Sequence, residues 1–117
     1  MIKSIIYACR GLRYAFLHEQ NFRIQVGMAA IVLLFAFLLH VRLLHFLILL
    51  SLIMFVLILE LINTAVEKML DVIKPRLSFH VEEVKDVMAG AVLVAAFGAG
   101  VIGMLIFLPY IVELVHP

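Results

Sequence analysis

The sequence of 117 residues has little charge, few prolines and a single cysteine. That cysteine, Cys9, has no partner for a disulfide within the chain. Charged residues make up 15% of the chain and the formal net charge is +1, which is too small to indicate nucleic acid as a partner. The sequence also lacks a Gly-x-x-x-x-Gly-Lys-Ser/Thr loop, so it shows no nucleotide-binding signature of the familiar kind.

Apolar residues take the place of the missing charge. They make up 67% of the chain and give a mean hydropathy of +1.25, whereas soluble domains contain roughly 45–50% apolar residues. We therefore predict an all-α integral membrane protein with a single domain over residues 1–117. Arg10 and Arg13 interrupt the apolar pattern near the N-terminus, so no cleavable signal peptide is expected.

Hydrophobic periodicity divides the chain into one surface helix and three spans. Apolar residues fall on one face of residues 2–18, which predicts an amphipathic helix lying in the membrane surface. A first span is expected over about 22–40, because residues 24–39 carry no charge. The second apolar run leads into polar residues without a breaker, which predicts one helix over 43–73. A third span is expected over about 85–108.

Two prolines set the expected ends of these elements. Pro75 should stop the second span, because proline disfavours helical geometry in the residue before it. Residues 76–84 are then expected to form a short polar link, and Pro109 to mark the end of the third span. Small residues such as Ala96/Gly100 and Ala99/Gly103 should let another helix approach the third span closely.

Lysine and arginine placement predicts the orientation of the chain. Only Arg42 lies between the first and second spans. The N-terminus and the second link are therefore expected in the cytoplasm and the C-terminus outside. The other basic residues lie before the first span or around the second link: Lys3, Arg10, Arg13, Arg23, Lys68, Lys74, Arg76 and Lys85.

A polar stripe follows the second span where it should leave the membrane. Glu60, Asn63, Thr64, Glu67 and Asp71 are spaced at i, i+3, i+4, i+7 and i+11, so they share one face of a helix. A carboxylate in hydrocarbon costs several kcal/mol. Such a stripe is therefore retained only where it packs on a partner, meets water or holds an ion.

The depth of this stripe suits phosphoryl transfer at a membrane surface. Glu60 should lie near the inner headgroup boundary, where a carboxylate can act as a general base on a lipid hydroxyl. Glu67 lies about 10 Å further toward the cytosol, and Glu19 approaches the same interface from the first span. Two carboxylates plus phosphate oxygens are the usual way in which magnesium is held, and Lys85 and Arg23 could neutralise phosphates. Solvated interfacial charges would give the same spacing, so the spacing alone names no substrate.

Three motifs resemble those of a known family. Glu60-x-x-Asn63-Thr64-Ala65-x-Glu67-x-x-x-Asp71 is similar to the signature of the prokaryotic diacylglycerol kinases. Lys85-Asp86-x-x-Ala89-Gly90-Ala91-Val92 and Glu19-x-Asn21-Phe22-Arg23 resemble two further blocks of the same family. The Asn-Phe-Arg motif and the Ile106-Phe107-Leu108-Pro109 ending look more like the undecaprenol kinase branch, although the acidic link departs from that branch's lysine-rich link.

The resemblance implies an ATP-dependent lipid kinase that assembles as a homotrimer, with sites between neighbouring subunits. Its substrate would be undecaprenol, with diacylglycerol as the alternative. Glu60 would be the catalytic base, and Glu19 and Glu67 would bind Mg²⁺ and, through it, ATP. Further nucleotide contacts would come from Lys3, Tyr7, Arg10, Asn63, Lys85 and Asp86. Supporting roles would fall to Arg23, Thr64 and Asp71.

Two other classes of protein remain open at this point. One is a small oligomeric transporter or proton conductor, which usually places a single carboxylate near the middle of the bilayer. The other is a structural subunit whose polar stripe packs against a larger partner. The clustering of carboxylates toward one membrane face, followed by the Lys85-Asp86 pair, favours the kinase over the transporter.

Overall fold

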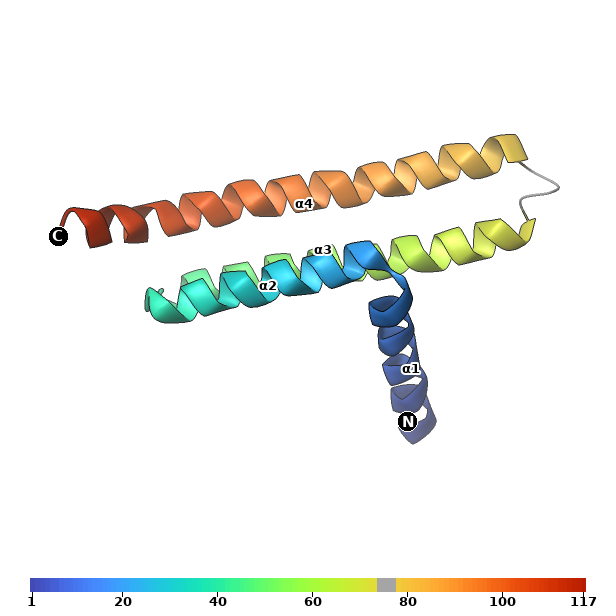
Figure 1. The fold of residues 1–117 in the computed structure, drawn as a ribbon, viewed down its shortest axis with the longest axis horizontal. Helices are drawn as coiled ribbons and strands as arrows, with labels where there is room; N and C mark the ends of the chain where they lie inside the picture. The colour runs from blue at the N-terminus through green and yellow to red at the C-terminus, as the bar shows by residue number, and fades with distance from the viewer. Residues whose placement is uncertain (74–77) are drawn as a thin grey trace.

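The computed structural model describes residues 1–73 and 78–117, and these form four helices (Figure 1). No strand occurs in the described part of the chain, which confirms the all-α prediction. The helices follow in the order α1 (Ile2–His18), α2 (Gln20–Leu38), α3 (Leu43–Ile73) and α4 (Ser78–Val115).

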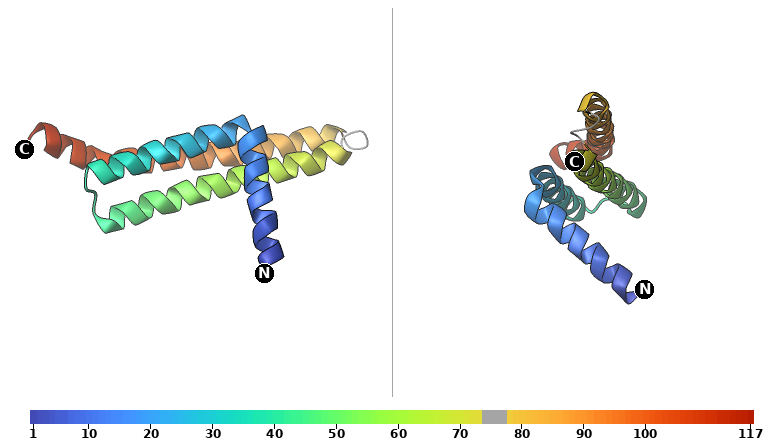
Figure 2. Two further views of the ribbon diagram at one scale, coloured as in Figure 1. Left: turned by 60° about the horizontal axis from the view of Figure 1, so that its bottom comes forward. Right: turned by 90° about the vertical axis from the view of Figure 1, so that its right-hand side faces the viewer.

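Three of the helices run side by side, and the first turns away from them. Helix α3 contacts both α2 and α4. Helix α1 departs from the start of α2 on the side away from α4 (Figures 1 and 2). The whole chain measures 62 × 37 × 21 Å along its principal axes. Helices α2, α3 and α4 are each long and apolar enough to cross a membrane, in agreement with the composition.

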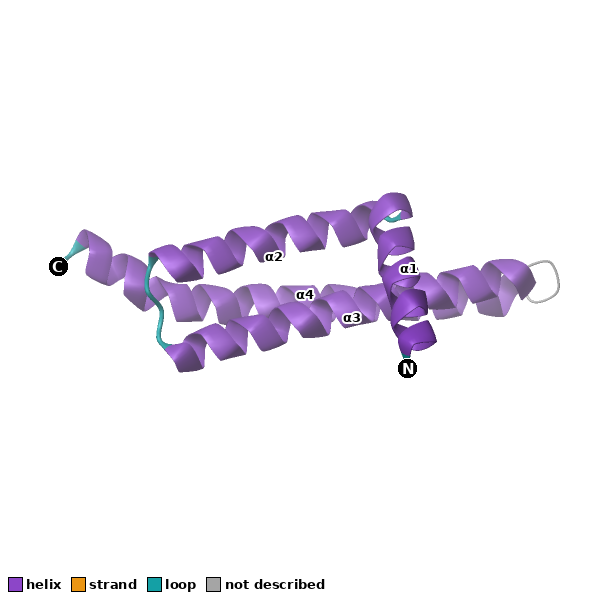
Figure 3. Ribbon diagram, turned by 90° about the horizontal axis from the view of Figure 1, so that it is seen from below, coloured by secondary structure: helices purple, strands orange, loops and turns teal. Residues whose placement is uncertain are grey.

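Helix α3 is longer than the membrane is thick, and it continues past the start of α2 (Figure 3). Its 31 residues span about 46 Å, whereas the 19 residues of α2 span about 28 Å. The bounds of α3 are those expected from the uninterrupted run before Pro75. Helix α2 ends at Leu38 rather than near residue 40, because His40 adopts a φ of 51°, a left-handed conformation that a helix cannot continue through.

The third span differs from its prediction at both ends. Instead of about 85–108, α4 runs over Ser78–Val115. The predicted polar link over 76–84 was therefore wrong for residues 78–84, which are helical, while residues 76–77 lie outside the described residues. Val81 is buried, which gives the first turn of α4 an apolar contact that the polar composition concealed. Pro109 lies inside the helix rather than at its end. A proline removes one backbone hydrogen bond, but the apolar residues around it still favour a helix where no water can replace the remaining bonds.

Most apolar side chains face away from the chain's own interior. Only 11%, 11% and 6% of the most apolar windows of the three spans are buried within the chain. A Cβ at Gly103 would meet Leu49 at 3.9 Å, whereas one at Gly100 would meet no described atom within 4 Å. Gly103 therefore lies at the contact of α4 with α3, whereas Gly100 faces an open surface. The buried apolar residues in the described part are Ala15, Phe22, Ala36, Leu49, Val56, Leu70 and Val81.

Candidate active site

The polar stripe of α3 is the most buried polar surface of the described chain. Glu60 is 2% exposed, Asn63 8% and Thr64 7%, in a molecule whose apolar residues are mostly exposed. The Thr64 hydroxyl donates to the backbone carbonyl of Glu60 at 3.0 Å, so it satisfies itself within the helix. Because Glu60 is covered and contacts Gln25 of α2, its carboxylate lies between helices rather than in water.

Gln25 of α2 meets Glu60 across the helix interface. Its Nε2 donates to Glu60 Oε2 at 3.4 Å, and Asn63 also interacts with Glu60 through its side chain. Gln25 Oε1 and Asn63 Oδ1 are both buried without a hydrogen-bond partner in the described structure. The sequence analysis missed Gln25. The sequence nevertheless marks this residue as unusual, because Gln25 is the only polar side chain between residues 24 and 39.

Glu19 and Glu67 lie close enough to Glu60 for their charges to act on its carboxylate. Both are half-buried, one between α1 and α2 and the other seven residues along α3. Glu60 and Glu67 therefore share a face, as their spacing predicted. Backbone hydrogen bonds fix Glu19 on both sides: its N–H donates to Ala15 at 2.9 Å, and its carbonyl accepts from the N–H of Arg23 at 3.2 Å.

Arg23 joins the end of α1 to the start of α2. Its guanidinium Nη1 donates to the carbonyls of Phe16 at 2.8 Å and Leu17 at 3.0 Å. These carbonyls belong to the last turn of α1, so no later residue of the helix donates a hydrogen bond to them. The C-terminal end of a helix also carries partial negative charge, which attracts a cation such as Arg23. Arg23 thus holds the corner at which Glu19 lies.

Lys85 joins the start of α4 to the end of α3. Its Nζ lies 2.7 Å from Asp71 Oδ1, and the side chains of Lys85 and Asp71 are 23% and 57% exposed. The charges of Glu67 and Glu82 also act on Lys85. A cation therefore faces the same side of α3 as the carboxylates, with Asp86 exposed beside it.

The residues expected on α1 do not reach the carboxylates of their own chain. Lys3, Tyr7 and Arg10 are exposed, and Arg10 lies over the Tyr7 ring at 5.8 Å. With a rise of about 1.5 Å per residue, Lys3 lies about 24 Å along the helix axis from Glu19. Near the bundle, α1 is held instead by Tyr14.

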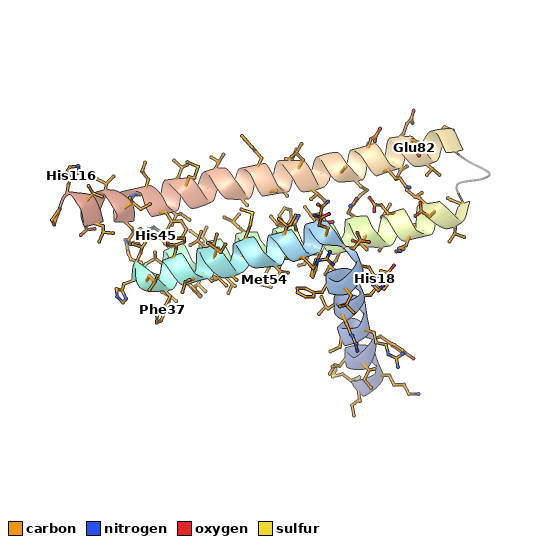
Figure 4. The ribbon with its side chains drawn as sticks, in the orientation of Figure 1. His18, Phe37, His45, Met54, Glu82 and His116 are labelled. Atoms are coloured by element: carbon orange, nitrogen blue, oxygen red, sulfur yellow. The ribbon has the colours of Figure 1, made fainter. Side chains whose placement is uncertain are left out.

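Tyr14 connects α1 to α3 through a contact that the sequence analysis did not foresee. The Lys68 ammonium lies 4.9 Å from the centroid of the Tyr14 ring, a cation–π distance. His18 stacks on the same ring at 4.3 Å, at the junction of α1 with the bundle (Figure 4). Both contacts lie on the exposed surface, beside the corner occupied by Glu19.

The carboxylates suit a magnesium ion shared with phosphates rather than a closed metal cage. In residues 1–73 and 78–117, no group of three or more His, Cys, Asp or Glu side chains could hold a metal alone. Magnesium commonly takes one or two protein carboxylates and fills its other positions with phosphate oxygens and water. Glu19 and Glu67, which each act on Glu60, and the unpartnered Asn63 oxygen are the groups that could contribute to such a donor set.

The opposite end of the bundle has its own polar contact. The Tyr110 hydroxyl of α4 accepts from the backbone N–H of Arg42 at 3.0 Å and lies 2.7 Å from His45 Nδ1. His45 and His116 mark this end in Figure 4, far along the bundle from His18. The contact fastens α4 to the turn between α2 and α3, away from the carboxylates.

Comparison with known proteins finds matches over almost the whole chain. A family described as prokaryotic diacylglycerol kinase matches residues 6–107. An undecaprenol kinase from Bacillus subtilis is 37% identical over 107 residues, which cover 92% of this chain and 87% of that protein. A diacylglycerol kinase from Synechocystis sp. is 37% identical over 116 residues, which cover 97% of this chain and 66% of that protein.

Proposed function

The chain belongs to the prokaryotic diacylglycerol kinase family and is an ATP-dependent lipid kinase, and we propose that undecaprenol is the lipid alcohol that it phosphorylates. The similar undecaprenol kinase matches over 87% of its own length, against 66% for the similar diacylglycerol kinase. Diacylglycerol is the second candidate, because the two relatives are equally identical to this chain. We treat residues 1–117 as a single lipid kinase domain.

The burial of Glu60 carries the proposed mechanism. At 2% exposed, this carboxylate is shielded from bulk water, and the lipid hydroxyl would have to enter between the helices to reach it. Glu60 would take the proton of the alcohol as the alcohol oxygen forms a bond to the γ-phosphorus. The bond between that phosphorus and the β–γ bridging oxygen breaks, and ADP leaves with the electron pair.

The neighbouring residues would bind and orient the nucleotide. Glu19 and Glu67 would hold magnesium, which when bound neutralises charge on the phosphates. Asn63 of α3 and Lys85 of α4, which faces the same side of α3, would contact the phosphates. Asp86, next to Lys85, would also contact the nucleotide. Thr64, Arg23 and Asp71 would support the site through the contacts described above: the bond to the Glu60 carbonyl, the corner at Glu19 and the ion pair with Lys85.

We further propose a homotrimer with active sites between subunits. The three spans bury little of their apolar surface within one chain, so neighbouring copies could cover part of it. Lys3, Tyr7 and Arg10 lie well away from the carboxylates of their own chain. An amphipathic α1 on the membrane surface would direct them toward the ATP of a neighbouring site.

The orientation follows from the proposed chemistry. ATP is cytoplasmic, so the end of the bundle that holds Glu19 and Glu67 should face the cytoplasm. The chain would then be a multi-pass protein of the bacterial inner membrane, with its N-terminus inside and its C-terminus outside. This assignment agrees with the excess of lysine and arginine at the same end.

A single substitution tests the role of Glu60. Glu60→Gln should abolish transfer of labelled phosphate from ATP to the lipid, because an amide cannot accept the alcohol proton. Glu113→Gln, which neutralises an exposed carboxylate near the far end of α4, is the matched control and should keep full activity. Full activity of Glu60→Gln, with oligomer assembly unchanged, would exclude Glu60 as the base.

The substrate is tested by a direct comparison. Purified protein in mixed micelles is given undecaprenol or diacylglycerol at equal mole fraction, and kcat/KM is measured for each. A higher value with undecaprenol supports the proposal, whereas a higher value with diacylglycerol assigns the chain to the other activity of the family.

A further inference from the structure

Gln25 is an amide in an otherwise apolar part of α2, about 8 Å along the helix from its first residue. A primary amide is costly to bury in apolar surroundings unless it is hydrogen-bonded. The contact at 3.4 Å with Glu60 is the hydrogen bond that the described structure gives its side chain. The position of this amide is therefore explained by Glu60.

The chemistry of the two groups fixes which way the amide points. An ionised carboxylate can only accept hydrogen bonds, so Gln25 must present its N–H to Glu60. The amide oxygen then faces away, and it is buried without a partner, like the oxygen of Asn63. Glu60 is thus bracketed by two amides, one across the interface on α2 and one on its own helix.

We propose that Gln25 is a positioning residue that orients the Glu60 carboxylate for proton transfer. The last torsion of a glutamate side chain is broad, so packing alone does not fix the plane of its carboxylate. Because Gln25 holds Oε2 from α2, Oε1 is the oxygen left to accept the proton of the alcohol. This inference rests on the proposed function of Glu60 as the base, and it adds a residue of the first span to the reaction.

The test is a double-mutant cycle with a matched control. Gln25→Met preserves length and volume but removes the donor, and Gln20→Met makes the same change on an exposed residue of the same helix. We expect Gln25→Met to lower kcat about fivefold with the KM for ATP unchanged, and Gln20→Met to change neither. In a Glu60→Asp background the shorter carboxylate no longer reaches α2, so Gln25→Met should change kcat less than twofold.

Each outcome decides the proposal. An unchanged kcat in Gln25→Met overturns it, and so does an equal loss in both backgrounds, which would indicate a purely structural role. If Gln25→Met fails to assemble, Gln25→Asn keeps the amide but withdraws it by one methylene, and it should give the same loss in kcat. If Glu60→Gln is inactive but Gln25→Met has an unchanged kcat, this inference is refuted and the proposed function of Glu60 stands. Full activity in Glu60→Gln refutes the proposed function as well.

Discussion

The corner formed by Arg23 offers a quantitative test of how Glu19 is positioned. Arg23→Met keeps most of the side-chain length but removes the donor to the carbonyls of Phe16 and Leu17, at 2.8 and 3.0 Å. A hydrogen bond to a charged group contributes about 1.5–3 kcal/mol at most. Because the two bonds share one nitrogen on an exposed surface, we expect about 1–2 kcal/mol for the pair. The population of misplaced α1 should therefore rise about 5- to 30-fold.

This loss should appear in the magnesium dependence of the kinase. Glu19 lies at the corner, so a loosened α1 holds its carboxylate in place for a smaller fraction of the time. The magnesium concentration for half-maximal rate should therefore rise in Arg23→Met, and by no more than the roughly 5- to 30-fold change in the population of misplaced α1. It should rise less in Arg23→Lys, whose ammonium can replace part of the contact. Glu19→Gln sets the upper limit, because it removes the carboxylate itself.

A second measurement separates the position of α1 from the binding of the metal. Cys9 is the only cysteine of the chain and is exposed on α1, so a spin label there reports the motion of that helix. With a second label at Ser51→Cys on α3, the distance distribution should broaden in Arg23→Met. An unchanged distribution would refute the role of Arg23 in holding α1. A broadened distribution with an unchanged magnesium titration would refute the dependence of the metal on Glu19.

Two further predictions concern opposite ends of the bundle. Glu67→Gln should raise the magnesium requirement about tenfold or more while Glu113→Gln leaves it unchanged, because Glu67, unlike Glu113, lies close to Glu60. Equal titrations in both variants would argue against a metal at Glu67. Tyr110→Phe should lower the free energy of unfolding by about 1–2 kcal/mol in a denaturation assay, because it leaves the N–H of Arg42 and the ring of His45 without their partner. Its kcat should stay unchanged, and a large loss in kcat would show that this end is coupled to the site.

Periodicity in the sequence predicted the features that lie within single helices. The bounds of α1 and α3, and the shared face of Glu60 and Glu67, depend on a spacing of 3.6 residues per turn and on Pro75. The extension of α4 could not be found in this way. Its first turns are rich in charge, and they are helical because Val81 packs inside the chain and Lys85 pairs with Asp71, which are contacts between helices.

Contacts between helices also explain why Gln25 was missed. A sequence shows which residues share a face of one helix, but not how two neighbouring helices are rotated about their axes. An isolated glutamine in an apolar span nevertheless carries a physical signal, because an amide there needs a partner. Glu60 was the buried group opposite, and the pairing became visible only when the rotation of α2 against α3 was known.

The direction of α1, which turns away from the bundle, connects these separate contacts to one mechanism. Helices α2, α3 and α4 are long and apolar enough to cross a membrane together, so a helix that turns away from them, as α1 does, would lie closer to the membrane plane than they do (Figure 1). Glu60 is paired with a residue about 8 Å inside α2, which would place it on the lipid side of that plane. Glu67 lies about 10 Å further along α3, toward the water. Since one rigid helix carries both carboxylates, the distance between the proposed base and the proposed metal ligand is fixed by helix geometry.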